Sequence, residues 1–188
     1  MFQVDEIIVY GKQGVCKIVA KGKLDMSMID KKTAALLAGA TMIGAIQGGA
    51  DTLSRQHLFT FATELGLAFQ LQDDLLDAYG TEEQLGKPIG GDILEGKKSF
   101  LMLTALDRAD ATVRKRLQAL LDNKSLVAEE KVREVLEIYN SLCVRDIAEQ
   151  EITSHFSKAM EALSNLEVDA HRVEPLKELA QSLLGRNK

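Results

Sequence analysis

One long apolar pattern, interrupted by three aspartates, most constrains the fold of this chain. Hydrophobic side chains recur at helical spacing from about Thr52 to Ala78, which predicts a single long and largely buried helix. Asp73 and Asp77 stand one turn apart on it and Asp74 lies beside them, so three carboxylates share a helix face. No basic residue stands three or four positions away to pair them. Carboxylates beside a core are costly without a nearby cation, and hard oxygen ligands suit Mg²⁺ better than zinc. The pattern therefore predicts a magnesium site on a buried helix.

A solvated acidic face is the alternative for the bare DDxxD pattern, but the glycine-rich segment after it favours a binding site. GKPIGGD and GKKS place Lys87, Asp92 and Lys97 on a turn-rich stretch directly after the carboxylates. Gln70, one turn before Asp74, joins the polar stripe. Anionic oxygens on a ligand could bridge a metal ion and the lysine ammonium groups. Together these residues predict a metal–diphosphate site.

The segment from Leu65 to Ser99, with FQLQDDLLD followed by GKPIGGDI and GKKS, carries a family resemblance. It resembles the second aspartate-rich region of the trans-isoprenyl diphosphate synthases, the farnesyl and geranylgeranyl diphosphate synthase family. The resemblance runs from about Met28 to the C-terminus, and it is closest to the short bacterial synthases. It includes KT opening an Ala/Gly-rich helix and the ending LKELAQSLLGRNK. The resemblance implies an all-α helical bundle of the isoprenoid synthase type, of which the later half is present.

The same resemblance implies a prenyltransferase that joins an allylic diphosphate to isopentenyl diphosphate. In that chemistry Mg²⁺ and lysines stabilise the departing pyrophosphate while an allylic carbocation forms. Matched position by position, the resemblance implies that Asp73, Asp74 and Asp77 bind Mg²⁺, with Asp92 in the outer shell. It also implies that the diphosphate is bound by three catalytic lysines, Lys32, Lys87 and Lys97, with Thr33 and Gln70 nearby.

The sequence also departs from the family, because it contains no second DDxxD. The family needs one on a facing helix of its earlier half, together with an early Gly-Lys-Arg region that grips isopentenyl diphosphate. We therefore expect the chain to be incomplete alone, as a homo-oligomer or with a partner chain that supplies the missing helices. The alternative is a non-catalytic helical interaction subunit or synthase remnant, whose unpartnered helices expose an apolar face. The product chain length is not predicted.

Residues 1–27 differ from the helical domain predicted over 28–188. Two β-rich runs, Val4 to Tyr10 and Val15 to Ala20, flank a GKQG turn and predict a hairpin. This stretch resembles the opening strands of the CarD-type domain, which in its family binds RNA polymerase. We interpret it as a non-native or borrowed N-terminal segment; an ordinary short hairpin or frayed leader is the alternative.

Charge and cysteine content indicate which partners and which cellular compartment to expect. A net charge of −5 argues against a nucleic-acid surface, and the two separate cysteines indicate a reducing cytoplasm rather than a disulfide or zinc framework. No stretch is long and apolar enough to span a bilayer. His57, His155 and His171 stand alone, which favours surface or core positions over ligation.

The rest of the sequence predicts further helices, one long loop and short connections. A loop is expected over Gly80–Gly96, unusually long for a helix–helix connection. The sequence predicts an Ala/Gly-rich helix ending at Gly48-Gly49, with Asp51 capping the next one, and helices over about Lys97–Arg108, Ala111–Leu121, Ala128–Tyr139, Val144–Leu163 and Glu174–Leu184.

Overall fold

A computed structural model describes residues 7–9, 15–17, 32–81, 83, 86, 88–123 and 125–185 of this chain. The predicted boundary between 1–27 and 28–188, and the predicted GKQG turn, lie outside the described residues. The helices are α1 (Lys32–Gln47), α2 (Thr52–Tyr79), α4 (Gly91–Leu94), α5 (Phe100–Arg108), α6 (Ala111–Asp122), α7 (Ala128–Ser141), α8 (Val144–Ser164) and α9 (Ala170–Leu184). The all-α prediction is confirmed for the main body of the chain.

Two short strands precede the helices. Strand β1 (Ile7–Val9) pairs antiparallel with β2 (Val15–Lys17), and Ile8 stands opposite Cys16. Both strands fall inside the two β-rich runs of the sequence, as expected for a hairpin.

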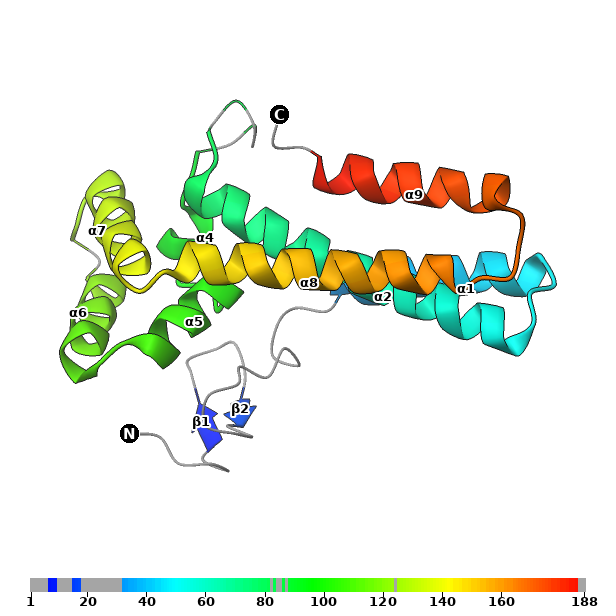
Figure 1. Ribbon diagram of the computed structural model, residues 1–188. Helices are drawn as coiled ribbons and strands as arrows, with labels where there is room; N and C mark the ends of the chain where they lie inside the picture. The colour runs from blue at the N-terminus through cyan, green and yellow to red at the C-terminus, as the bar shows by residue number, and fades with distance from the viewer. Residues whose placement is uncertain are drawn as a thin grey trace.

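Helix α2 is the axis of the molecule. Its apolar spacing continues without a break, and it begins at a capping residue, Asp51, whose carboxylate accepts the Ser54 N–H at 2.8 Å. Helices α1 and α8 pack along it, and α8 runs beside most of its length (Figure 1). Among the described residues, no helix combines the length and apolar character needed to cross a membrane.

The core divides into two clusters placed along α2. One lies at its second half, where α4 to α7 and the start of α8 cover Leu71, Leu75 and Ala78, with Tyr139 of α7 almost fully buried. The other lies at its first half, where α1, α9 and the end of α8 enclose Phe61 and Leu65. The aspartates of α2 therefore lie in the half that α4, α5 and α7 surround.

Three predicted boundaries need correction. The expected loop contains a short helix, α4, and α5 begins at Phe100 rather than Lys97 because the Ser99 hydroxyl caps the Met102 N–H. Helix α9 begins at Ala170 rather than Glu174, so that Pro175 lies within the helix. The other predicted helices agree with the structure to within three residues at each end.

Gly66 brings α1 and α2 into close contact. A Cβ atom added at Gly66 would lie 2.5 Å from the Cα atom of Ala34, inside any allowed contact distance. Ala34 is itself buried, at 4% exposure. The absence of a side chain at this one position therefore sets the spacing of the two helices.

We expect Gly66→Ala to lower stability, because the added methyl group must push the α1 backbone away from α2. Overpacking of this kind costs about 1–3 kcal/mol, roughly 3–10 °C in melting temperature for a chain of this size. Gly39→Ala on α1 is the matched control, since nothing lies within 4 Å of its added Cβ. Differential scanning calorimetry should show that control unchanged or slightly stabilised. Equal melting temperatures for Gly66→Ala and wild type would contradict this account of the packing.

Candidate functional site

The three aspartates of α2 differ in how far each is buried. Asp74 and Asp77 are each 3% exposed, whereas Asp73 is exposed at the surface. The segment from Gly90 to Phe100 folds back over α2 and donates backbone N–H groups to the two buried carboxylates, whereas Asp73 remains exposed. One face of α2 thus presents an exposed carboxylate next to two that protein donors hold.

Asp77 anchors the glycine-rich segment to α2. Its Oδ2 atom accepts the Asp92 N–H at 2.8 Å, and its backbone carbonyl accepts the Gly90 N–H at 2.6 Å. Gly90 has φ +80°, and a Cβ atom there would lie 2.5 Å from Val132 Cγ2. Only glycine meets both the backbone and the packing requirement. This explains chemically why the segment reads IGGD at the point where it turns onto the helix.

Asp74 receives hydrogen bonds from three segments. Its Oδ1 atom lies 3.2 Å from Gln70 Nε2 and 3.3 Å from Lys97 Nζ, and its Oδ2 atom accepts the Phe100 N–H at 3.3 Å. No basic residue lies within one turn of these aspartates on α2. The cation that pairs with Asp74 stands 23 residues further along the chain.

The network extends from both ends of this contact. Lys97 Nζ also lies 2.6 Å from Asp92 Oδ2, and Gln70 Oε1 accepts a 3.3 Å hydrogen bond from the Thr33 hydroxyl on α1. Five of the predicted site residues are therefore joined: Thr33, Gln70, Asp74, Asp92 and Lys97. A connected polar network of this kind is costly to bury unless its members satisfy one another.

The charges of the network depend on one another. Burial raises the pKa of the Asp74 carboxyl, an effect that Lys97 partly offsets. Burial disfavours the charged form of Lys97, but hydrogen bonds and attraction from Asp92 and Asp74 outweigh it and raise the pKa of Lys97. Lys97 is therefore a persistent ammonium ion at neutral pH, held between two carboxylates.

The structure also describes Lys32, a predicted site residue, and the histidine His155. Lys32 is the first residue of α1 and is exposed, next to Thr33. Lys87 lies outside the described residues. His155, which the sequence left as an isolated residue, is a buried partner of Glu64, with 2.6 Å between Nδ1 and Oε2 linking α8 to α2. No sequence signal connects two residues so far apart in the chain.

The donor chemistry fits a divalent metal ion. Asp73, Asp74, Asp77 and Asp92 offer carboxylate oxygens, the ligands that Mg²⁺ prefers. Among the described residues, no three or more His, Cys, Asp or Glu side chains converge tightly enough to hold a metal as they stand. In this conformation Lys97 and backbone N–H groups take up oxygens that a metal would use. The site therefore has the right ligands, arranged around an internal cation.

Comparison with known proteins gives the family. The family profile described as "Polyprenyl synthetase" matches residues 21–139. The short chain isoprenyl diphosphate synthase of Methanothermobacter thermautotrophicus is 40% identical over 161 residues, which are 86% of this chain and 48% of that protein. Heptaprenyl diphosphate synthase component 2 of Bacillus subtilis is 38% identical over 109 residues, 58% of this chain and 29% of that one.

A solved structure agrees with these matches. Geranylgeranyl pyrophosphate synthase from Corynebacterium glutamicum, complexed with isoprenyl diphosphate and magnesium, superposes with a TM-score of 0.75 at 28% identity. The superposition covers 82% of this chain and 44% of that structure. The chain thus spans about half the length, or less, of these relatives. The extent of the profile match, the sequence identity and the shared helical arrangement together show that this chain belongs to the polyprenyl synthetase family.

Proposed function

We propose that this chain contributes the diphosphate-ionising half of an isoprenyl diphosphate synthase, which condenses an allylic diphosphate with isopentenyl diphosphate. The observation that carries the proposal is the network joining Thr33, Gln70, Asp74, Asp92 and Lys97, which gathers acceptors for a metal and donors for a phosphate at one place. The names of the relatives support the same reaction class.

The roles follow from charge and exposure. We propose Mg²⁺ as the metal, held by Asp73, Asp74 and Asp77, because these oxygens suit it and a related structure is described with magnesium. When bound, it would neutralise charge that develops on the leaving pyrophosphate. Lys97 and Lys32 would donate to the diphosphate oxygens, as would Lys87. Thr33 and Gln70 position Asp74, through the hydrogen bonds described above.

The proposed site needs a second group of metal ligands, which we assign to a partner. The sequence holds a single DDxxD, and the relatives are about twice as long as the matched part. We therefore propose that helices equivalent to the uncovered half of those relatives dock on this chain. A relative whose name describes it as component 2 supports a division between two chains. Two separate cysteines are consistent with a cytoplasmic setting.

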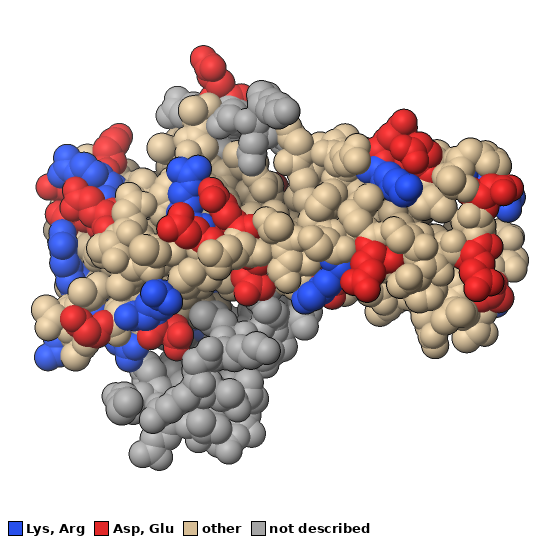
Figure 2. Space-filling view, viewed as in Figure 1, with Lys and Arg blue, Asp and Glu red and all other residues tan. Residues whose placement is uncertain are grey.

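An apolar surface suits such docking. We define the α1–α2 surface as Leu36, Ile43 and Ile46 of α1 with Leu53 and Phe59 of α2, each at least half exposed. Spacings of seven and three residues place the α1 members on one helix face. The space-filling view shows charged side chains of both signs crowded over α6 and α7, at the other end of the molecule from the start of α2 (Figure 2).

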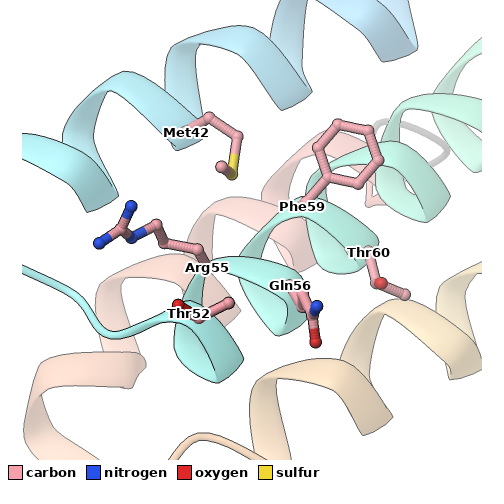
Figure 3. A pocket seen from close by; sticks show the side chains of 6 residues that line it. All are labelled: Met42, Thr52, Arg55, Gln56, Phe59 and Thr60. Atoms are coloured by element: carbon pink, nitrogen blue, oxygen red, sulfur yellow. The ribbon is translucent and has the colours of Figure 1, made fainter.

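A hollow deepens this surface. Met42 from α1 and Phe59 from α2 point toward the same space, and Arg55, Gln56 and Thr60 also line it (Figure 3). Its volume is about 400 Å³, enough to receive large side chains of a docked helix. Exposed apolar area of this kind marks an association site.

We expect Mg²⁺ with inorganic pyrophosphate to raise the melting temperature of the chain, since a ligand that binds only the folded state stabilises it. At a hundredfold excess over Kd the gain is about 2.7 kcal/mol, roughly 5–10 °C. Asp73→Asn should lose at least half of this shift, measured against the variant's own ligand-free melting temperature, because the neutral amide is a poorer metal ligand than the carboxylate. Asp107→Asn, an exposed aspartate on α5, is the matched control. A full shift in Asp73→Asn would remove that residue from the site.

Purified alone, the chain should form little prenyl diphosphate from isopentenyl and allylic diphosphates. The second group of metal ligands, which would help to stabilise the leaving pyrophosphate, is lacking. Loss of a single oxyanion donor already lowers rates about 10²–10³-fold. A separate polypeptide with the earlier helices and their DDxxD should restore turnover. Radiolabelled isopentenyl diphosphate incorporation measures both. Rapid turnover without any addition would contradict the need for a partner.

Ile43→Glu should block that restoration, because a buried unpaired carboxylate in the docked interface is costly. The melting temperature of the isolated variant should stay within about 1–2 °C of wild type, since Ile43 is 62% exposed. Leu179→Glu on α9 is the matched control: it is also an exposed apolar residue, at 47%, but lies on another helix. If the added polypeptide restores turnover equally in both variants, the partner docks elsewhere. If the chain forms dimers that Ile43→Glu disrupts and Leu179→Glu does not, the α1–α2 surface instead binds a second copy of this chain.

A further inference from the structure

Lys97 occupies the position where the carboxylates of the site need a cation. Its Nζ atom lies 3.3 Å from Asp74 Oδ1 and 2.6 Å from Asp92 Oδ2. The lysine side chain is 38% exposed, whereas Asp74 and Asp92 are at 3% and 18%. The ammonium group thus reaches inward from the surface and neutralises oxygens that lie deeper than itself.

We propose that Lys97 is an internal counter-ion that a divalent metal ion must displace from Asp74 and Asp92, so that metal binds well only when a diphosphate is present to accept Lys97. The inference rests on the proposed function, and it adds a coupling between the two ligands of that site. Without diphosphate, a metal ion is repelled by the Lys97 ammonium group that already binds its carboxylate ligands. Without metal, a diphosphate is repelled by the Asp74 and Asp92 carboxylates. Each ligand removes the obstacle that the other faces, which is positive and reciprocal coupling.

Displacement of Lys97 would leave Asp74 in place. Asp74 Oδ2 keeps the Phe100 N–H, and Gln70 Nε2 remains on Oδ1, so the carboxylate is still oriented when the lysine departs. The backbone of Lys97 is anchored as well, because its N–H donates to the Asp92 carbonyl at 2.8 Å. Exchange of partners therefore requires rotation of one long, partly exposed side chain, with α2 and α5 unchanged.

The charges favour exchange when both ligands are present. Asp74, Asp92 and Lys97 together carry one net negative charge. Removal of the ammonium group leaves two, so that these carboxylates add to the attraction that Asp73 and Asp77 exert on a divalent ion. A diphosphate carries several negative charges and holds the ammonium group more strongly than two carboxylates that have gained a metal.

The experiment measures binding of Mn²⁺, as a probe for the divalent ion, to the full chain by isothermal titration calorimetry, with and without inorganic pyrophosphate. Lys97→Gln should bind Mn²⁺ alone about tenfold or more tightly than wild type, the scale of one unit charge across a few ångströms in a partly screened site. Pyrophosphate should strengthen Mn²⁺ binding clearly in wild type and much less in Lys97→Gln. Lys97→Met, also neutral, replaces Lys97→Gln if circular dichroism shows that the latter does not fold.

Two controls isolate the charge. Lys97→Arg keeps the cation and should bind Mn²⁺ alone no more tightly than wild type; Lys158→Gln removes an exposed charge on α8 and should change nothing. Equal affinity of wild type and Lys97→Gln for Mn²⁺ alone, or an equal gain in Lys97→Arg, overturns the inference while leaving the proposed function intact. If Mn²⁺ affinity does not respond to pyrophosphate even in wild type, the proposed function fails and this inference fails with it.

Discussion

The burial of the Asp74 carboxylate is the interaction on which the arrangement of the site depends. An ionised carboxylate withdrawn from water destabilises the folded state by several kcal/mol unless donors replace its hydration. Here the donors come from α2 itself, from the segment before α5 and from the first N–H of α5. Conformations of that segment that leave Asp74 without these donors are disfavoured by the same amount. One buried charge thus fixes where α5 begins relative to α2.

A second contact holds the other end of the segment. Asp77 binds the backbone at Gly90 and Asp92, and Val132 of α7 presses against Gly90, where no side chain fits. Helix α7 contributes none of the proposed ligands, yet its packing against Gly90 determines how far the segment from Gly90 to Phe100 lies from α2. The position of Asp92, a proposed site residue, therefore depends on Val132, a core residue of a helix that carries none of the proposed ligands.

Local patterns were predictable from the sequence, and contacts between distant segments were not. The long helix, its Asp51 cap and the helical class follow from apolar spacing and capping chemistry, both of which act within a few residues. The gathering of Thr33, Gln70, Asp74 and Lys97 follows from the family resemblance rather than from spacing, because these residues come from separate elements. The burial of Asp74 and the exposure of Asp73 could not be predicted from the sequence, since that difference depends on which segment covers α2. The Glu64–His155 pair, 91 residues apart, had no sequence signal at all.

The backbone hydrogen bond between Lys97 and Asp92 has a kinetic consequence. Because the main chain beneath Lys97 is closed by its own hydrogen bonds, a change of partner for the ammonium group involves side-chain torsions alone. Rotamer changes of exposed side chains take picoseconds to nanoseconds, whereas lid opening and local unfolding take microseconds or longer. Rearrangement of this lysine is thus far faster than the turnover of ordinary enzymes, about ten per second. We therefore expect the proposed exchange of partners by Lys97 not to be the step that limits turnover.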